Sequence, residues 1–210
     1  MVILRFLKVA FCLLVVSCSV IIDSSAQDDL LQEPEYSQAD YRYADVFEIL
    51  DGEWQGEFII YEDSKPSALS VVNLNNLSLA NLDKKSIKEV NRIKVKQVYT
   101  SESRYFQRVV ITDTYPDSDK VEVSNGVNKI EDGKMWCIVN KPNETIVHSG
   151  STRDNNTILW QSYQNDPQKI EFFQETVGGK YYEIIGFGYY TKDDSSKSPP
   201  LWFYGKYERQ

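Results

Sequence analysis

The stretch "ILDGEWQGEFIIYE", from Ile49 to Glu62, contains the change of pattern that decides the fold. Residues 45–50 place apolar side chains along one side of a single helical turn. From Trp54 onward the residues alternate with a period of two, which is typical of a β-strand with two different faces. The sequence therefore predicts a short N-terminal helical turn that leads through Gly52 into a first strand.

Strand-like runs continue from residue 92 to the end of the sequence. Turn-forming pairs such as Gly178-Gly179 separate these runs, and no helical pattern lies between them. Many short strands with such turns form an antiparallel meander. With about eight to ten strands, closure into a barrel is the arrangement that leaves no edge strand unpaired. We therefore predict an all-β, antiparallel up-and-down barrel of eight to ten strands over residues 45–210.

One segment after the predicted first strand lacks strand alternation. Residues 63–91 are rich in Asn and Ser, and their apolar residues show only a weak helical spacing. Insertions of this length are usually either a lid over a site or a mobile loop. We expect a long loop or helical insertion here, near the mouth of the barrel.

The N-terminal region predicts export. Residues 1–26 contain a short apolar run preceded by basic residues, which is typical of a signal peptide. Two processing sites remain open, because "VVSC" resembles a lipoprotein signal that ends at residue 17 and lipidates Cys18, whereas "SSA" predicts cleavage after Ala26. Residues 27–44 are polar and acidic and predict a tether. We expect an outer-membrane or periplasmic lipoprotein, or a secreted protein, with membrane contact only through the lipid anchor.

Charge and residue counts exclude several classes of function. The formal charge of −8 and the lack of a basic stripe argue against a nucleic-acid partner. The single histidine, His148, excludes a metal site built from several histidines, and leaves His148 as a candidate axial ligand for haem or as the base of a Ser-His-Asp triad. Without residues 1–26 only Cys137 remains, so we expect a buried thiol and no disulfide. We expect no metal and no cofactor.

Acidic side chains near the C-terminus are the other candidates for catalysis. Glu171, Glu175 and Glu183 lie on two adjacent predicted strands, and paired carboxyl groups can cleave glycosidic bonds. We expect Glu171 and Glu175 on an outer, solvated face, and His148 beside a turn at the surface. The sequence therefore favours binding over catalysis.

The order of these elements resembles the lipocalins and the wider group of calycin barrels. The resemblance lies in a short helical turn, then Gly-x-Trp, then an alternating first strand and a meander. In that family the tryptophan closes one end of the barrel and packs beneath a basic side chain from the last strand. The resemblance assigns closure to Gly52 and Trp54 and offers either Lys206 or Arg209 as the basic side chain. Small bacterial lipocalin-like proteins are the nearest comparison.

This resemblance implies a barrel that binds a small hydrophobic molecule. If Trp54 points inward, Phe58 and Ile60 do so as well, because they share its face. Tyr105 and Trp160 are further candidates for the wall of a cavity, and an eight-stranded barrel has room for one small ligand.

A structural protein of the cell envelope is the alternative function. Its barrel would be filled by side chains, and its outer face would meet an envelope protein. An exposed aromatic patch of Tyr181, Tyr189 and Trp202 would then be expected.

Overall fold

The computed structural model describes residues 29–64, 77, 87–165, 168–191, 193–195, 197 and 199–210. The predicted signal peptide with Cys18 lies outside these residues, as does most of the predicted insertion. Among the described residues, no helix has the length and hydropathy needed to cross a membrane.

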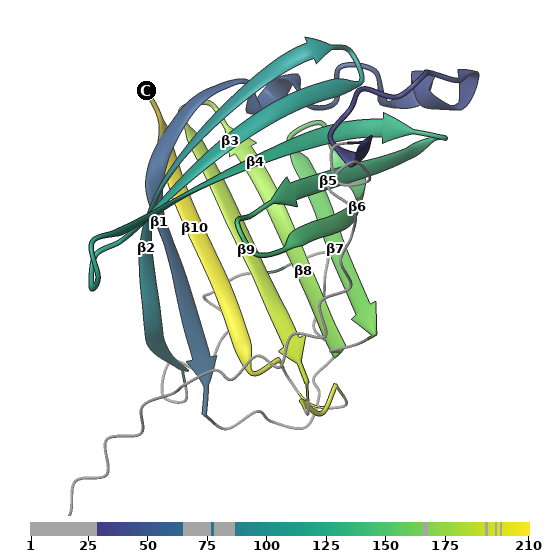
Figure 1. Ribbon diagram of the computed structural model, residues 1–210. Coiled ribbons are helices and arrows are strands. Elements are labelled where there is room, and N and C mark those ends of the chain that lie inside the picture. The colour runs from purple at the N-terminus through teal and green to yellow at the C-terminus, as the bar shows by residue number, and fades with distance from the viewer. Residues whose placement is uncertain are drawn as a thin grey trace, which may run out of the picture.

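Ten antiparallel strands form a closed barrel in which each strand pairs with its neighbours in the sequence and the last strand pairs with the first (Figure 1). The predicted all-β, antiparallel up-and-down barrel is therefore confirmed. Strand β2 begins earlier than predicted, so the connection after β1 is shorter than the insertion expected at residues 63–91. The strands are β1 (Gly52–Asp63), β2 (Ile87–Ser103), β3 (Phe106–Tyr115), β4 (Lys120–Glu131), β5 (Lys134–Asn140), β6 (Thr145–Asp154), β7 (Thr157–Asn165), β8 (Gln168–Gly178), β9 (Tyr181–Tyr190) and β10 (Leu201–Arg209).

The pairing of β1 with β10 closes the barrel. The register runs from Trp54 opposite Arg209 to Glu62 opposite Leu201. At Gly56 the two backbones approach so closely that a Cβ atom would overlap the carbonyl oxygen of Lys206. A glycine at this position is therefore a condition for closure.

A packed core fills the end of the barrel at which β1 begins. Residues from nine of the ten strands contribute buried side chains to one cluster, which only the interior of the barrel can bring together. The 3₁₀ turn η2 (Glu48–Leu50) adds Leu50 to this cluster, and Phe47 precedes it. The side-chain amide of Gln107 holds the turn in place, because its Nε2 donates to the Phe47 carbonyl and to Asp51 Oδ1, each at 2.8 Å. This end of the barrel is solid.

Aromatic rings lie against the inner wall at four inward glycines. At each such glycine, an added Cβ atom would meet the ring, so the missing side chain makes room for it. Gly186 and Gly188 belong to this group and make room for rings of the protein itself. The pairs are Gly150 with Trp160, Gly186 with Phe173, Gly188 with Tyr190 and Gly205 with Tyr207.

The described part of the predicted acidic tether docks against the barrel. The 3₁₀ helix η1 (Gln38–Tyr43) contains Asp40, which is fully buried and accepts the N–H groups of Ser37 and Gly133, each at 2.6 Å. Arg42 donates to the Gly133 carbonyl oxygen at 2.6 Å. Residues 29–50 therefore form a strap across the solid end, at the top of Figure 1.

A second apolar cluster covers the outer face of β8, β9 and β10. It consists of Leu77, Phe172, Ile185, Phe187, Tyr189 and Trp202. The prediction of an exposed patch is wrong for two of its three residues, because Tyr189 and Trp202 are only 8% and 5% exposed. Their polar atoms are also satisfied, since Tyr189 donates to the Lys197 carbonyl and Trp202 to that of Pro199. Tyr181 is exposed and lies beneath the ammonium group of Lys206.

Candidate functional site

The residues assigned to barrel closure lie at the solid end. Trp54 is fully buried, and its indole N–H donates to the Leu50 carbonyl at 2.6 Å. The guanidinium carbon of Arg209 lies 4.4 Å from the centroid of the Trp54 ring, whereas Lys206 lies over Tyr181. Arg209 is thus the cation over the tryptophan, because the β1–β10 register places it opposite Trp54.

The four predicted cavity residues occupy different places. Phe58 lies on the inner face and stacks on Phe203 of β10, with ring centroids 5.9 Å apart, and Ile60 lies opposite Phe203 in the register. Tyr105 is not on a barrel wall, because it lies in the turn between β2 and β3, with its ring 4.8 Å from that of Tyr36. Trp160 belongs to the packed core of the solid end.

A polar cluster lies inside the barrel, where the sequence predicted solvent-exposed groups. His148 of β6 and Glu171 of β8 are only 9% and 7% exposed. The expectation of an outer glutamate and a surface histidine is therefore wrong. The reason lies in β8, where Glu171 shares a face with Phe173, and the Phe173 ring covers the inward Gly186. The opposite face of β8 is also apolar and is covered by the outer cluster, so alternation alone does not show which face is inside.

Glu171 is the centre of the cluster. Its Oε2 lies 3.2 Å from the Lys169 ammonium group and 3.8 Å from His148 Nε2, and its Oε1 accepts the Tyr190 hydroxyl at 2.5 Å. Burial tends to raise the pKa of this carboxyl, but His148, Tyr190 and Lys169 outweigh burial and lower the pKa to about 2. Glu171 is therefore an anion at any physiological pH.

One atom of the cluster has no hydrogen-bond partner among the described residues. His148 Nε2 is buried and makes no hydrogen bond, because 3.8 Å to Glu171 Oε2 is an ion-pair distance and too long for a hydrogen bond. The edge of the Phe173 ring packs against the imidazole, with centroids 5.5 Å apart. A buried nitrogen of this kind lowers stability unless another molecule bonds it.

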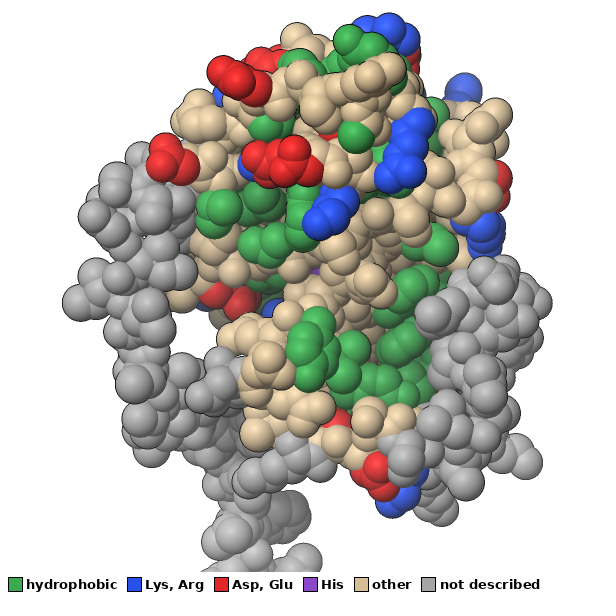
Figure 2. Space-filling view, turned by 90° about the vertical axis from the view of Figure 1, so that its right-hand side faces the viewer, with side chains coloured by type: hydrophobic (Ala, Val, Ile, Leu, Met, Phe, Trp, Pro, Cys, Tyr) green, Lys and Arg blue, Asp and Glu red, His purple; other side chains and the backbone are tan. Residues whose placement is uncertain are grey.

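The barrel wall opens beside this atom. The pairing of β6 with β7 ends at Ser149 opposite Gln161. In the part of the chain that the structure describes, Val147 and His148 then pair only with β5, and Tyr163 pairs only with β8. Figure 2 faces this side of the barrel and shows a hollowed surface in which the histidine colour is recessed between other side chains.

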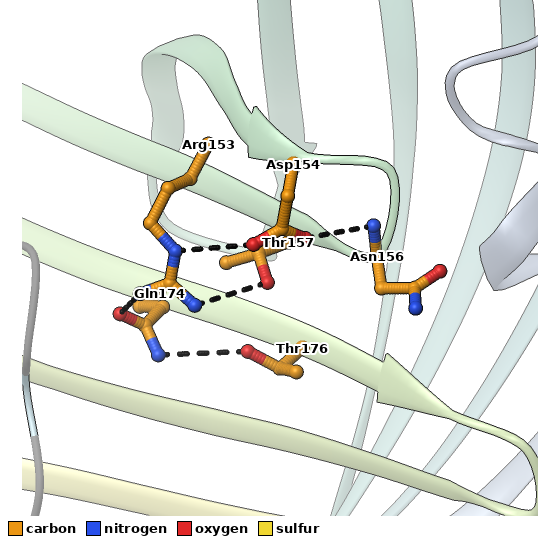
Figure 3. Close-up of polar contacts among 6 residues, drawn as sticks. All are labelled: Arg153, Asp154, Asn156, Thr157, Gln174 and Thr176. Carbon is orange, nitrogen blue, oxygen red and sulfur yellow. Dashed lines mark hydrogen bonds and ion pairs between the residues drawn. The ribbon is translucent and has the colours of Figure 1, made fainter.

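The other end of the β6–β7 pair is held shut on the outer face (Figure 3). Arg153 donates to Gln174 Oε1 of β8 at 2.9 Å, to Thr157 Oγ1 at 3.3 Å and to Asp154 Oδ2 at 3.2 Å. The Asn156 N–H donates to Asp154 Oδ1 and shapes the turn between the two strands. This cluster faces away from the interior and is structural.

Glu175 is a second glutamate of the interior, half-buried, four positions along β8 and on the same face. Its Oε2 accepts the indole N–H of Trp160 at 2.9 Å. Burial raises the pKa of this carboxyl, against the opposing effects of Trp160, Tyr182 and His148. The pKa values of the two glutamates therefore shift in opposite directions, because three polar groups lie beside Glu171, whereas burial dominates at Glu175.

We expect Glu175→Gln to change how stability depends on pH. A raised pKa in the folded state stabilises the protein fully below the unfolded pKa of about 4.5, and this contribution is lost as the pH rises through the folded pKa. Glutamine does not titrate, so the variant does not lose this contribution as the pH rises. Its free energy of unfolding should therefore increase relative to that of the wild type, by about 1.4 kcal/mol for each unit by which the folded and unfolded pKa values of Glu175 differ. Urea unfolding at pH 4, 6 and 8 measures this, with Glu183→Gln on the outer face as the control. Parallel pH profiles for wild type and Glu175→Gln would contradict it.

Among the described residues, no group of three or more His, Cys, Asp and Glu side chains is placed to hold a metal ion. Burial raises the pKa of the Cys137 thiol, so this residue is a poor nucleophile. We assign no haem to His148, because its unbonded nitrogen lies 3.8 Å from the Glu171 carboxylate oxygen, a polar position that suits a small hydrogen-bonding group.

Comparisons with known proteins add little to this geometry. No protein-family model and no curated protein matches the chain. A solved structure described as "Structure of EF1p2_mFAP2b bound to DFHBI" matches it with 10% identity and a TM-score of 0.36, over 80% of this chain and 99% of that chain. A likeness at this level supports no statement about this chain. The strands and the site themselves define a closed, ten-stranded antiparallel barrel with a polar cluster buried in its wall.

Proposed function

We propose that this protein is a non-enzymatic binding barrel that holds a small molecule with an apolar body and a hydrogen-bonding head group. The observation that carries the proposal is the unpartnered, buried Nε2 of His148 beside the Glu171 carboxylate. A buried polar atom without a partner costs about 1–3 kcal/mol, and a ligand that bonds it recovers this cost.

An aromatic surface for the apolar body adjoins the polar cluster. The rings of Phe173 and Phe203 stack with centroids 5.4 Å apart, and Phe203 in turn stacks on Phe58. Phe173 also contacts His148, so this stack leads directly to the unpartnered nitrogen. Sites of this kind combine an apolar lining with a few polar groups that orient the ligand.

The resemblance to the calycin barrels supports the same function. The Gly52-x-Trp54 motif and the position of Arg209 over the indole agree with the closure that this family uses. On the basis of this resemblance we propose that residues 45–210 form the binding domain. We also propose that residues 1–26 act as a signal peptide and direct the export of the protein. Mass spectrometry of the mature chain distinguishes a lipidated Cys18 from an N-terminal Gln27.

An interaction protein of the cell envelope is the weaker alternative. The burial of Tyr189 and Trp202 removes two of the three residues of the surface that it needs.

The test is binding of 6-propionyl-2-dimethylaminonaphthalene (prodan), an uncharged fluorescent probe whose carbonyl oxygen accepts hydrogen bonds. The wild-type protein should bind it, and His148→Phe should weaken binding at least about tenfold, because the polar partner of the head group is lost. Ser149→Ala is the matched control, since Ser149 is the next residue on β6 and donates to a backbone oxygen of β7 outside the site. It should change the Kd less than twofold. Absence of binding by the wild type, or equal affinity in His148→Phe, would overturn the proposed function.

A further inference from the structure

The gap between His148 and Glu171 has two chemically different sides. Ionised Glu171 only accepts hydrogen bonds. An imidazole nitrogen that faces a carboxylate favours carrying its hydrogen, so His148 Nε2 acts as a donor. A group that fills the gap must therefore accept on one side and donate on the other.

A hydroxyl group is both donor and acceptor at a single atom. Hydrogen bonds to a hydroxyl oxygen are about 2.8 Å long, so one oxygen can bond both Nε2 and Oε2 across their 3.8 Å separation. We propose that the ligand is an uncharged alcohol whose hydroxyl group sits between His148 and Glu171. This inference rests on the proposed function and adds to it the class of head group.

Charged head groups fit this position poorly. A ligand carboxylate bonded to Nε2 would lie against the Glu171 carboxylate, in a buried place where like charges repel strongly. Lys169 does not relieve this repulsion, because its ammonium group already lies 3.2 Å from Glu171 Oε2. A ligand ammonium group would face Lys169 in turn, and it has no lone pair with which to accept from His148.

A water molecule would satisfy the same two atoms, but it would not use the aromatic stack. The edge of Phe173 lies against the imidazole, and Phe203 and Phe58 extend that surface along the inner wall. The end of the β6–β7 pairing also adjoins His148, which places the hollow of Figure 2 beside this nitrogen. These features favour an alcohol with an apolar body.

The experiment is displacement of prodan from the full chain by 1-decanol, decanoate and decylamine, which share one chain length. Decanol should displace the probe at a concentration at least about tenfold lower than either charged ligand. In Glu171→Gln the preference for decanol over decanoate should fall below about threefold, because the repelling charge is gone while the side chain keeps its size. Glu183→Gln on the outer face is the control and should keep the wild-type preference.

The outcomes separate the two proposals. Decanoate that binds as well as decanol, or an unchanged preference in Glu171→Gln, overturns the alcohol assignment and leaves the binding function intact. Failure of decanol to displace a bound probe shows that the gap holds water only, which also overturns the assignment. Failure of the probe itself to bind overturns the proposed function. If Glu171→Gln does not fold, the alcohol assignment is tested by the wild type alone, through the ratio of the concentrations at which decanol and the charged ligands displace the probe.

Discussion

Gly56→Ala should prevent the barrel from closing. Gly56 lies opposite Tyr207 in the β1–β10 register, and an added methyl group would overlap the carbonyl oxygen of Lys206. The obstacle is backbone on the neighbouring strand, so no change of rotamer relieves it. Overpacking typically costs 1–3 kcal/mol, and the cost here should be about 3 kcal/mol or more because a whole strand must move.

Urea unfolding followed by tryptophan fluorescence and far-UV circular dichroism measures this loss. Gly178→Ala is the matched control, because nothing lies within 4 Å of a Cβ atom at Gly178. The control should change the free energy of unfolding by less than about 1 kcal/mol. Equal stability of the two variants would show that β1 and β10 are not held at the separation described.

Trp54→Ala should be the most destabilising change in the interior. The side chain is fully buried at the solid end, its N–H is bonded to Leu50, and its ring meets Tyr182 edge-on with centroids 5.6 Å apart. Truncation leaves a large cavity beside a turn that Trp54 itself anchors. The expected loss is about 3–5 kcal/mol in the free energy of unfolding.

Two further variants separate the contributions of burial and of the cation. Arg209→Met keeps an apolar stem over the indole and should cost at most about 1 kcal/mol. Trp136→Ala removes a half-buried tryptophan that packs against the outer cluster around Phe106, and it should cost less than Trp54→Ala. The assignment of Trp54 to barrel closure fails if its alanine variant is no less stable than that of Trp136.

The positions of β1 and of the later strands were predictable from the sequence, because alternation and turn residues act locally. The tight turn predicted at Gly178-Gly179 lies one residue later, because Gly178 ends β8 and pairs with Tyr181, which leaves Gly179 and Lys180 between β8 and β9. Glu171 and Phe173 were also correctly placed on one face, since period two follows from the geometry of any strand. The sequence did not show which face is inside, because Phe172 on the other face is equally apolar and is itself only 7% exposed.

The sequence by itself determined the class of fold and the residues that share each face. Only the tertiary structure decided that Arg209 and not Lys206 covers Trp54, because this depends on the register between the first and last strands. It also decided that His148 and Glu171 meet inside the barrel, although 23 positions separate them along the chain. Alternation along the sequence determines which residues of one strand share a face. Closure of the sheet determines which strands face one another across the interior.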